Sequence, residues 1–206
     1  MKDPVILVGG FPEMIELCES CGFRIAGLID PRLAGEFRGV RVLGRDADYP
    51  NLGPEVKAIP LVITPDLPER RRSLVDYYSR WNVLFAQVVS PRAIISPSAR
   101  LGRGTVIQAG VHISSNVILG DFVRINTQAN LMHDSTVGDF STVAPNALLL
   151  GRVTVGQRCY IGGQTTLLPD RRIGDRAVVG AGSVVTKDVP DGRTVWGNPA
   201  LEKATD

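Results

Sequence analysis

The feature that most constrains this chain is an aliphatic residue at every sixth position from residue 95 to residue 185. A period of six fits neither an amphipathic helix, which repeats about every 3.6 residues, nor a long strand that alternates with a period of two. It predicts a solenoid of hexapeptide repeats, in which short strands are joined by a turn every six residues. The positions of the series are Ile95, Leu101, Ile107, Ile113, Leu119, Ile125, Leu131, Val137, Val143, Leu149, Val155, Ile161, Leu167, Ile173, Val179 and Val185.

The residues around this series complete the picture of a coil. With three faces per coil the pattern repeats about every 18 residues, so about five coils lie between residues 95 and 185. The aliphatic residue points inward, and small or β-branched residues two positions before it fill the remaining interior. The residue that follows is often glycine, as in Gly102, Gly120, Gly138, Gly156, Gly162, Gly174 and Gly180. We expect these glycines to serve corners that need unusual backbone dihedrals.

The first 90 residues have a different pattern, which predicts a separate small α/β domain followed by the β-helix at 91–206. Short apolar runs alternate with segments at helical spacing, as expected for a βαβ unit with a parallel sheet. The predicted strands are 5–8, 23–30, 57–64 and 82–89, and the predicted helices are 13–20 and 66–80, with a loop between 30 and 57.

A strand, a glycine turn, a helix and a second strand that ends in an acidic residue form the outline of a nucleotide-binding unit. Here the turn offers Gly9 and Gly10, and the acidic residue is Asp30. Two interpretations stay open. The glycines could let a phosphate approach the backbone while Asp30 meets a ribose hydroxyl, or all three could simply form tight turns.

Composition narrows the partners and the compartment. A net charge of +2 gives no reason to expect nucleic acid or an anionic membrane as a partner. No apolar run of about 18 residues predicts a transmembrane span. Three cysteines, an odd and small number, indicate a reducing compartment, by default the cytoplasm. Cys18 and Cys21 form a lone CxxC without the second pair that a zinc site needs, and we expect no bound metal.

The repeats resemble those of the left-handed β-helix acyltransferases over residues 90–200, and the handedness follows from this resemblance. The segment "GAGSVVTKDVPDGRTVWGNPA" (180–200) is similar to that family's final coil and closing loop. The α/β domain before the helix narrows the resemblance to the sialic-acid O-acetyltransferase-like family, which includes bacterial N-acetyltransferases of nucleotide-linked amino sugars. It implies acetyl-CoA as co-substrate, a nucleotide sugar as acceptor, a role in polysaccharide biosynthesis, and a homotrimer with sites between subunits.

The resemblance also implies roles for single residues. The segment "NTQANLMHDSTVGDF" (126–140) is similar to the family's catalytic segment, which makes His133 the general base and Asp134 its acidic partner. Asn126 matches an asparagine near the active site, and Gly151 matches a glycine whose N–H faces the acetyl carbonyl. Further cofactor contacts are implied for two residues: Thr142, in the place of a second histidine, and Lys187, which would meet coenzyme A phosphates or be a solvated lysine.

The chemistry supports this assignment independently of the family. An amine or hydroxyl must lose its proton as it attacks a thioester, and a histidine that titrates near neutrality is a suitable base. A neighbouring carboxylate can fix the ring's tautomer, and a backbone N–H can stabilise the developing oxyanion. Gly151 lies 18 residues after His133, one coil away on the same corner. His112 has no acidic neighbour and is interpreted as structural or exposed.

Three alternatives remain at this point. The acceptor could be an alcohol on a sialic-acid-like sugar or another small molecule, since the same base serves both. The glycine-poor turns at 9–14 and 64–71 are compatible with a non-catalytic homologue. A zinc enzyme of the γ-carbonic-anhydrase kind would need three histidines, whereas this chain has two.

Overall fold

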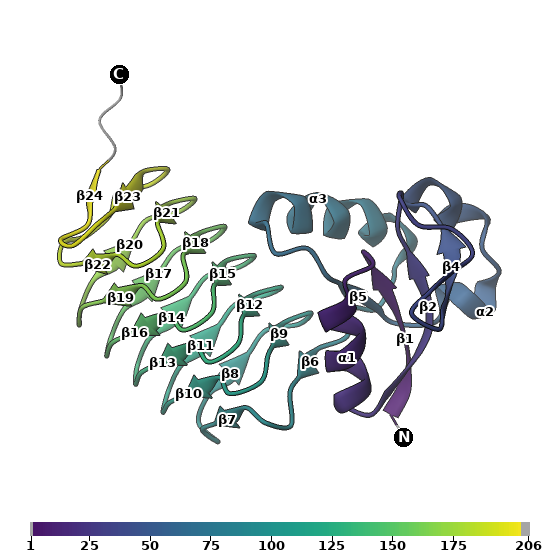
Figure 1. Ribbon diagram of the computed structural model, residues 1–206, viewed down its shortest axis with the longest axis horizontal. Coiled ribbons are helices and arrows are strands. Elements are labelled where there is room, and N and C mark those ends of the chain that lie inside the picture. The colour runs from purple at the N-terminus through teal and green to yellow at the C-terminus, as the bar shows by residue number, and fades with distance from the viewer. Residues whose placement is uncertain (1, 203–206) are drawn as a thin grey trace.

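The C-terminal part of the computed structural model, which describes residues 2–202, is a three-sided parallel β-helix whose coils stack along one axis (Figure 1). Its strands form one sheet of six, one of five and one of eight, the last including the closing strands β23 and β24. The strands are β6 Val88–Val89, β7 Ile94–Ile95, β8 Arg100–Leu101, β9 Val106–Ile107, β10 His112–Ile113, β11 Ile118–Leu119, β12 Arg124–Ile125, β13 Asn130–Leu131, β14 Thr136–Val137, β15 Thr142–Val143, β16 Leu148–Leu149, β17 Thr154–Val155, β18 Tyr160–Ile161, β19 Thr166–Leu167, β20 Arg172–Ile173, β21 Val178–Val179, β22 Val184–Val185, β23 Thr194–Trp196 and β24 Leu201–Glu202.

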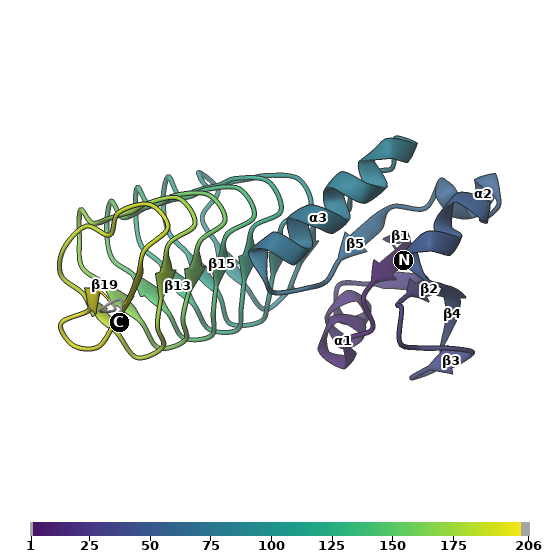
Figure 2. The ribbon, with the colours of Figure 1, turned by 90° about the horizontal axis from the view of Figure 1, so that it is seen from above.

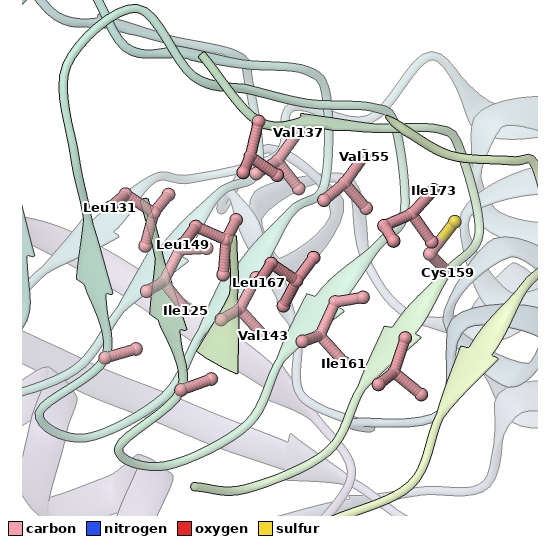
Figure 3. Packing of buried hydrophobic residues seen from close by; sticks show 14 of the residues in the cluster. Ile125, Leu131, Val137, Val143, Leu149, Val155, Cys159, Ile161, Leu167 and Ile173 are labelled. Atoms are coloured by element: carbon pink, nitrogen blue, oxygen red, sulfur yellow. The ribbon is translucent and has the colours of Figure 1, made fainter. Parts of the chain in front are cut away.

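The period-six residues form the core of this helix, as predicted. They point into the interior from all three sheets, with each one stacked on its counterpart 18 residues away (Figure 3). Leu131 pairs with Leu149, and Leu149 with Leu167, in an unbroken register. From Ile107 to Val185 every member of the series is at most 2% exposed. Stacking identical shapes at each level is what gives so short a strand a continuous core.

The glycines after the core residues have a different role from the predicted one. The left-handed backbone conformation occurs two positions further along, and most of the residues that adopt it are not glycines, for example Asn116, Asp134 and Arg152 with φ near 60°. The glycines instead allow close stacking, because a Cβ on Gly102 would lie 2.3 Å from the carbonyl oxygen of Gly120 in the next coil. The prediction that these glycines serve unusual dihedrals is therefore wrong.

The N-terminal part is an α/β domain with the strand order β3-β4-β2-β1-β5. Strands β1, β2, β4 and β5 are parallel, and β3 joins β4 in an antiparallel hairpin. The elements are β1 Lys2–Val8, α1 Pro12–Ser20, β2 Phe23–Ile29, β3 Glu36–Phe37, β4 Val40–Gly44, the 3-10 helix η1 Asp46–Asn51, α2 Pro54–Lys57, β5 Leu61–Ile63, α3 Pro68–Tyr78 and the 3-10 helix η2 Ser79–Trp81.

Two predictions for this domain need correction. The segment 30–57, expected to be a loop, contains β3, β4, η1 and α2, because "RVLG" is too short and too polar to stand out as a buried strand. The segment 82–89 does not form a full strand of the α/β sheet. Its last two residues, Val88–Val89, pair with Val106–Ile107 and so begin the β-helix.

Two buried arginines join the domains where the start of α3 meets the coils (Figure 2). Arg71 donates hydrogen bonds to the carbonyl oxygens of Phe122, Phe140 and Ser141 in the β-helix. Arg124 forms an ion pair with Asp66 and donates to the carbonyl oxygen of Thr64. These bonds fix the α/β domain to particular coils of the helix.

Candidate active site

His133 and Asp134 lie together on the corner that follows β13. The Nδ1 atom of His133 is 2.8 Å from Oδ2 of Asp134, and the two side chains are 48% and 46% exposed. Because an ionised carboxylate only accepts hydrogen bonds, Nδ1 carries the proton and Nε2 is left with a free lone pair. The pair therefore has the geometry of an oriented general base.

Gly151 stands next to the imidazole in the following coil. A Cβ on Gly151 would lie 2.6 Å from Nε2 of His133, so only glycine leaves the ring this position. The N–H of Gly151 forms no hydrogen bond within residues 2–202. The predicted neighbourhood of His133, Asp134 and Gly151 is thus present, with a donor and a base on one corner.

Lys187 occupies the same corner three coils further on. The unbroken register from β13 through β16 and β19 to β22 puts His133, Gly151, Pro169 and Lys187 in one column. Neighbouring strands are about 4.8 Å apart, so Lys187 is about 14 Å from His133 along the axis. Lys187 and Pro169 are exposed. The column is a shelf with a base at one end and a cation at the other.

Asn126 is placed elsewhere, in a cleft of about 420 Å³ between α1 and the β-helix. Its side-chain oxygen accepts a hydrogen bond of 3.0 Å from Arg124, and the side chain is largely buried. The wall opposite carries the carboxylates of Glu13 and Asp66, with Glu16 beside them. His133 is not among the lining residues of this cleft. Sequence reasoning did not single out the acidic wall, because it is assembled from two distant segments.

Thr142 belongs to the contact between the domains. It is fully buried, and its hydroxyl donates to the carbonyl oxygen of Asp66 at 2.6 Å while accepting from Arg71 at 3.0 Å. Both hydrogen-bonding capacities of the hydroxyl are used there. We therefore correct the expected donor contact of Thr142 and assign it to the domain junction.

Gly9, Gly10 and Asp30 meet at the carboxyl ends of β1 and β2. Asp30 is 2% exposed, and its carboxylate accepts the N–H groups of Gly10 and Arg32, each at 2.8 Å. Gly9 has a φ of 103°, and a Cβ there would lie 2.3 Å from Oγ1 of Thr64. The turn-forming interpretation accounts for all three residues, and their contact with a nucleotide stays a prediction.

The charges around Asp134 favour its ionised form. Its pKa is lowered first by the hydrogen bond from His133, then by one of 3.0 Å from the side-chain amide of Asn116, with a smaller effect of the Arg152 charge. Arg152 is itself held by Asp170 through bonds of 2.6 and 2.9 Å. Sequence reasoning missed Asn116 and Arg152, although each lies 18 residues from Asp134 and the repeat could have identified them.

Other expectations concern metals, membranes and thiols. Within residues 2–202 no group of three or more histidine, cysteine, aspartate or glutamate side chains could hold a metal ion. In the same range no helix has the length and apolar character of a membrane span. Cys18, Cys21 and Cys159 are free and buried, and burial raises the pKa of Cys18 to about 12 and that of Cys159 to about 11.

Comparison with known proteins adds to this geometry. Residues 152–187 match the family model described as bacterial transferase hexapeptide (six repeats). No curated protein sequence matches the chain. Among solved structures, GDP-perosamine N-acetyltransferase from Caulobacter crescentus, in complex with CoA and GDP-perosamine, is 32% identical with a TM-score of 0.90, over 98% of this chain and 97% of that one.

Two further structures resemble the chain over nearly its whole length. The acetyltransferase domain of PglB from Neisseria gonorrhoeae is 28% identical with a TM-score of 0.91, covering 97% of this chain and 99% of that one. WeeI from Acinetobacter baumannii is 27% identical with a TM-score of 0.86, covering 98% of this chain and all (100%) of that one. In each case the likeness includes both domains and the junction between them.

Proposed function

The chain belongs to the left-handed β-helix acetyltransferases with an N-terminal α/β domain, and from this premise we propose that it transfers an acetyl group from acetyl-CoA to the amino group of a nucleotide-linked sugar. The observation that carries the proposal is the likeness, at 32% identity over both domains, to a GDP-perosamine N-acetyltransferase bound to CoA and GDP-perosamine. The free, buried cysteines suit a cytoplasmic enzyme. An acetylated amino sugar of this kind would be a building block for a polysaccharide.

In this proposal His133 is the general base. The acceptor nitrogen attacks the thioester carbonyl carbon, and the proton that it loses passes to Nε2, the ring atom left free by the bond from Nδ1 to Asp134. The carboxylate fixes the tautomer and stabilises the imidazolium that forms. The proton then leaves with the departing thiolate as the carbon–sulfur bond breaks, so the base is regenerated.

The column from His133 to Lys187 is proposed to hold acetyl-CoA, which supplies an acetyl group activated as a thioester. The residues fit such a molecule, because Gly151 and Pro169 leave the shelf low between the base and the cation. The N–H of Gly151 is available to the carbonyl oxygen, where negative charge develops during attack. Lys187, about 14 Å along the axis, is positioned for phosphate groups.

The acceptor is proposed to bind in the 420 Å³ cleft, with the nucleotide against the Gly9–Gly10 turn. The carboxyl ends of parallel strands are the usual place for such ligands, and Asp30 holds this turn through the N–H of Gly10. Carboxylates of Glu13 and Asp66, with the amide of Asn126, suit the amino and hydroxyl groups of a sugar.

A homotrimer is proposed because one chain keeps the base and the acceptor cleft apart. His133 is half exposed on an outer corner and lies outside the lining of the cleft. A three-fold arrangement of prisms can place the corner of one chain against the cleft of its neighbour. The site would then be complete only between two subunits.

The test is an acetylation assay with acetyl-CoA and a panel of nucleotide-linked amino sugars. We expect release of free coenzyme A together with a product that withstands mild base, as an amide does. A product that mild base cleaves would indicate O-acetylation of an alcohol instead. Absence of acetyl-CoA binding in calorimetry would contradict both and favour a non-catalytic homologue.

A further inference from the structure

Asn116 stands one coil before Asp134 on the corner that carries the base. The register of β11 with β14 makes the two residues direct neighbours, and both have a φ of 60°. The backbone N–H of Asn116 donates to Oγ of Ser98 at 2.9 Å, which ties its turn to the previous coil. The side-chain amide of Asn116 then donates to Oδ1 of Asp134 at 3.0 Å.

The carboxylate of Asp134 is therefore held at both oxygens. Oδ1 accepts from Asn116, and Oδ2 pairs with Nδ1 of His133 at 2.8 Å. At 46% exposure, little packing restrains the carboxylate, so a single hydrogen bond would leave it free to rotate. Two bonds fix the plane of the carboxylate relative to the imidazole. The amide orients the carboxylate, and the carboxylate orients the ring.

Arg152, in the coil on the other side, cannot replace Asn116 in this role. Its guanidinium makes two bonds to Asp170, of 2.6 and 2.9 Å, and these direct it away from Asp134. It contributes positive charge to the corner without a hydrogen bond to the carboxylate. The charged groups that act on Asp134 are thus His133 and Arg152, and Asn116 adds a neutral donor.

We infer that Asn116 is a positioning residue for the base, the outer member of a hydrogen-bonded chain Asn116–Asp134–His133. The inference rests on the proposed function. Asn116 touches neither substrate in the proposal and acts only through Asp134. Its role resembles that of the residue that orients the carboxylate–histidine pair in catalytic triads generally.

The variant Asn116→Gly tests this inference, because glycine keeps the left-handed backbone and removes only the amide. We expect kcat to fall about tenfold with KM values unchanged, since a hydrogen bond to a charged group is lost while the binding surfaces remain. The matched control is Asn82→Gly, an exposed asparagine with a φ of 52° at the end of η2 in the α/β domain. It should keep wild-type kcat.

Asn116→Asp distinguishes orientation from the filling of space. The substitution keeps the size of the side chain but replaces the donor with a carboxylate that faces Asp134. We expect a loss of activity at least as large as in Asn116→Gly. Recovery of wild-type kcat by the aspartate would overturn the inference, because it would show that shape alone is needed.

A readout that does not depend on activity is NMR of the two histidines, with His112→Gln used to assign the signals. In the wild type, ¹⁵N shifts should show His133 mainly as the Nδ1–H tautomer, and Asn116→Gly should shift it toward the mixture of a free ring. The ¹³C titration of the Asp134 carboxyl should move to higher pH, since its pKa is lowered partly by Asn116. The carboxylate would then be lost at a higher pH on acidification.

The two readouts separate failure of the inference from failure of the proposed function. If wild-type protein acetylates no nucleotide amino sugar, the function fails, and the tautomer and titration still decide the role of Asn116. Unchanged tautomer and carboxyl titration in Asn116→Gly would overturn the inference even if kcat fell. A change in both, with Asn82→Gly like the wild type, would support it.

Discussion

The imidazole of His133 and the missing side chain of Gly151 define the reactive corner. One ring nitrogen is engaged by Asp134, and the other faces the backbone of the next coil at a distance that no Cβ could tolerate. The two residues are 18 apart and come from different strands. Their juxtaposition depends entirely on the register of the β-helix, so it is preorganised before any ligand binds.

Replacing the base should abolish most turnover and leave the fold intact. For His133→Ala we expect a loss of kcat of about a hundredfold or more, because general base catalysis contributes that much. Thermal unfolding should be unchanged, since the side chain is half exposed. Coenzyme A release under saturating substrates measures the effect. His112→Ala is the matched control, and equal losses in both variants would contradict the assignment.

Gly151→Ala should separate activity from stability at the same corner. The added methyl group would lie 2.6 Å from Nε2, and the exposed imidazole can turn away from it. We expect the free energy of unfolding to change by less than about 0.5 kcal/mol. The kcat should nevertheless fall about tenfold, because the ring leaves its oriented position. Wild-type kcat in this variant would show that the position of the ring is unimportant. Urea denaturation and steady-state kinetics measure the two quantities.

At the scale of elements, α3 is the fastener between the domains. Burial, and then the neighbouring charge of Arg124, lower the pKa of Arg71, yet the guanidinium is surrounded by carbonyl oxygens that need its N–H groups. Such a residue is expensive to bury and more expensive to remove. It fixes α3 to the coils that contain Phe122 and Ser141.

Arg71→Met should therefore destabilise the protein by about 3–5 kcal/mol, since it leaves several buried carbonyl groups without a donor. Equilibrium denaturation in urea, followed by circular dichroism, gives the change. Arg70→Met is the control, because its neighbour Arg70 is exposed. Similar stabilities of the two variants would show that the junction is held by other contacts.

The repeated elements were predictable from the sequence, and the junction elements were not. A period of six fixes strand, corner and core at every level, so His133 and Gly151 could be placed together from their spacing alone. The hand of the helix came only from the family resemblance. The hairpin of β3 and β4 has no periodic signal, and the role of Thr142 depends on α3, whose docking is a long-range event. The roles of the glycines were mistaken because close contact between coils has no signature within one coil.

At the scale of the whole molecule, the chain carries its base and its acceptor cleft in separate places. We expect a particle of three times the 22.2 kDa chain mass in analytical ultracentrifugation. A monomer at working concentrations with full activity would contradict the trimer proposal. The mass alone does not show that sites are shared, which needs a second experiment.

Subunit mixing supplies that experiment. His133→Ala and Asn126→Ala are each expected to be inactive, and neither should recover when refolded alone. Co-refolding the two variants in equal amounts should restore about a quarter of wild-type activity, because in a trimer that share of interfaces pairs an intact base with an intact cleft. No recovery would place both residues in the same chain's site.

The fixed register along the column from His133 to Lys187 makes the β-helix a ruler. Each coil is one graduation of about 4.8 Å, and the chain sets the span between base and cation as a whole number of graduations. Removal of a single residue would turn every later side chain to the wrong face, whereas an added coil of 18 residues would only lengthen the span. The reach of the donor that such an enzyme accepts is thus written in its sequence in steps, and can be redesigned in the same steps.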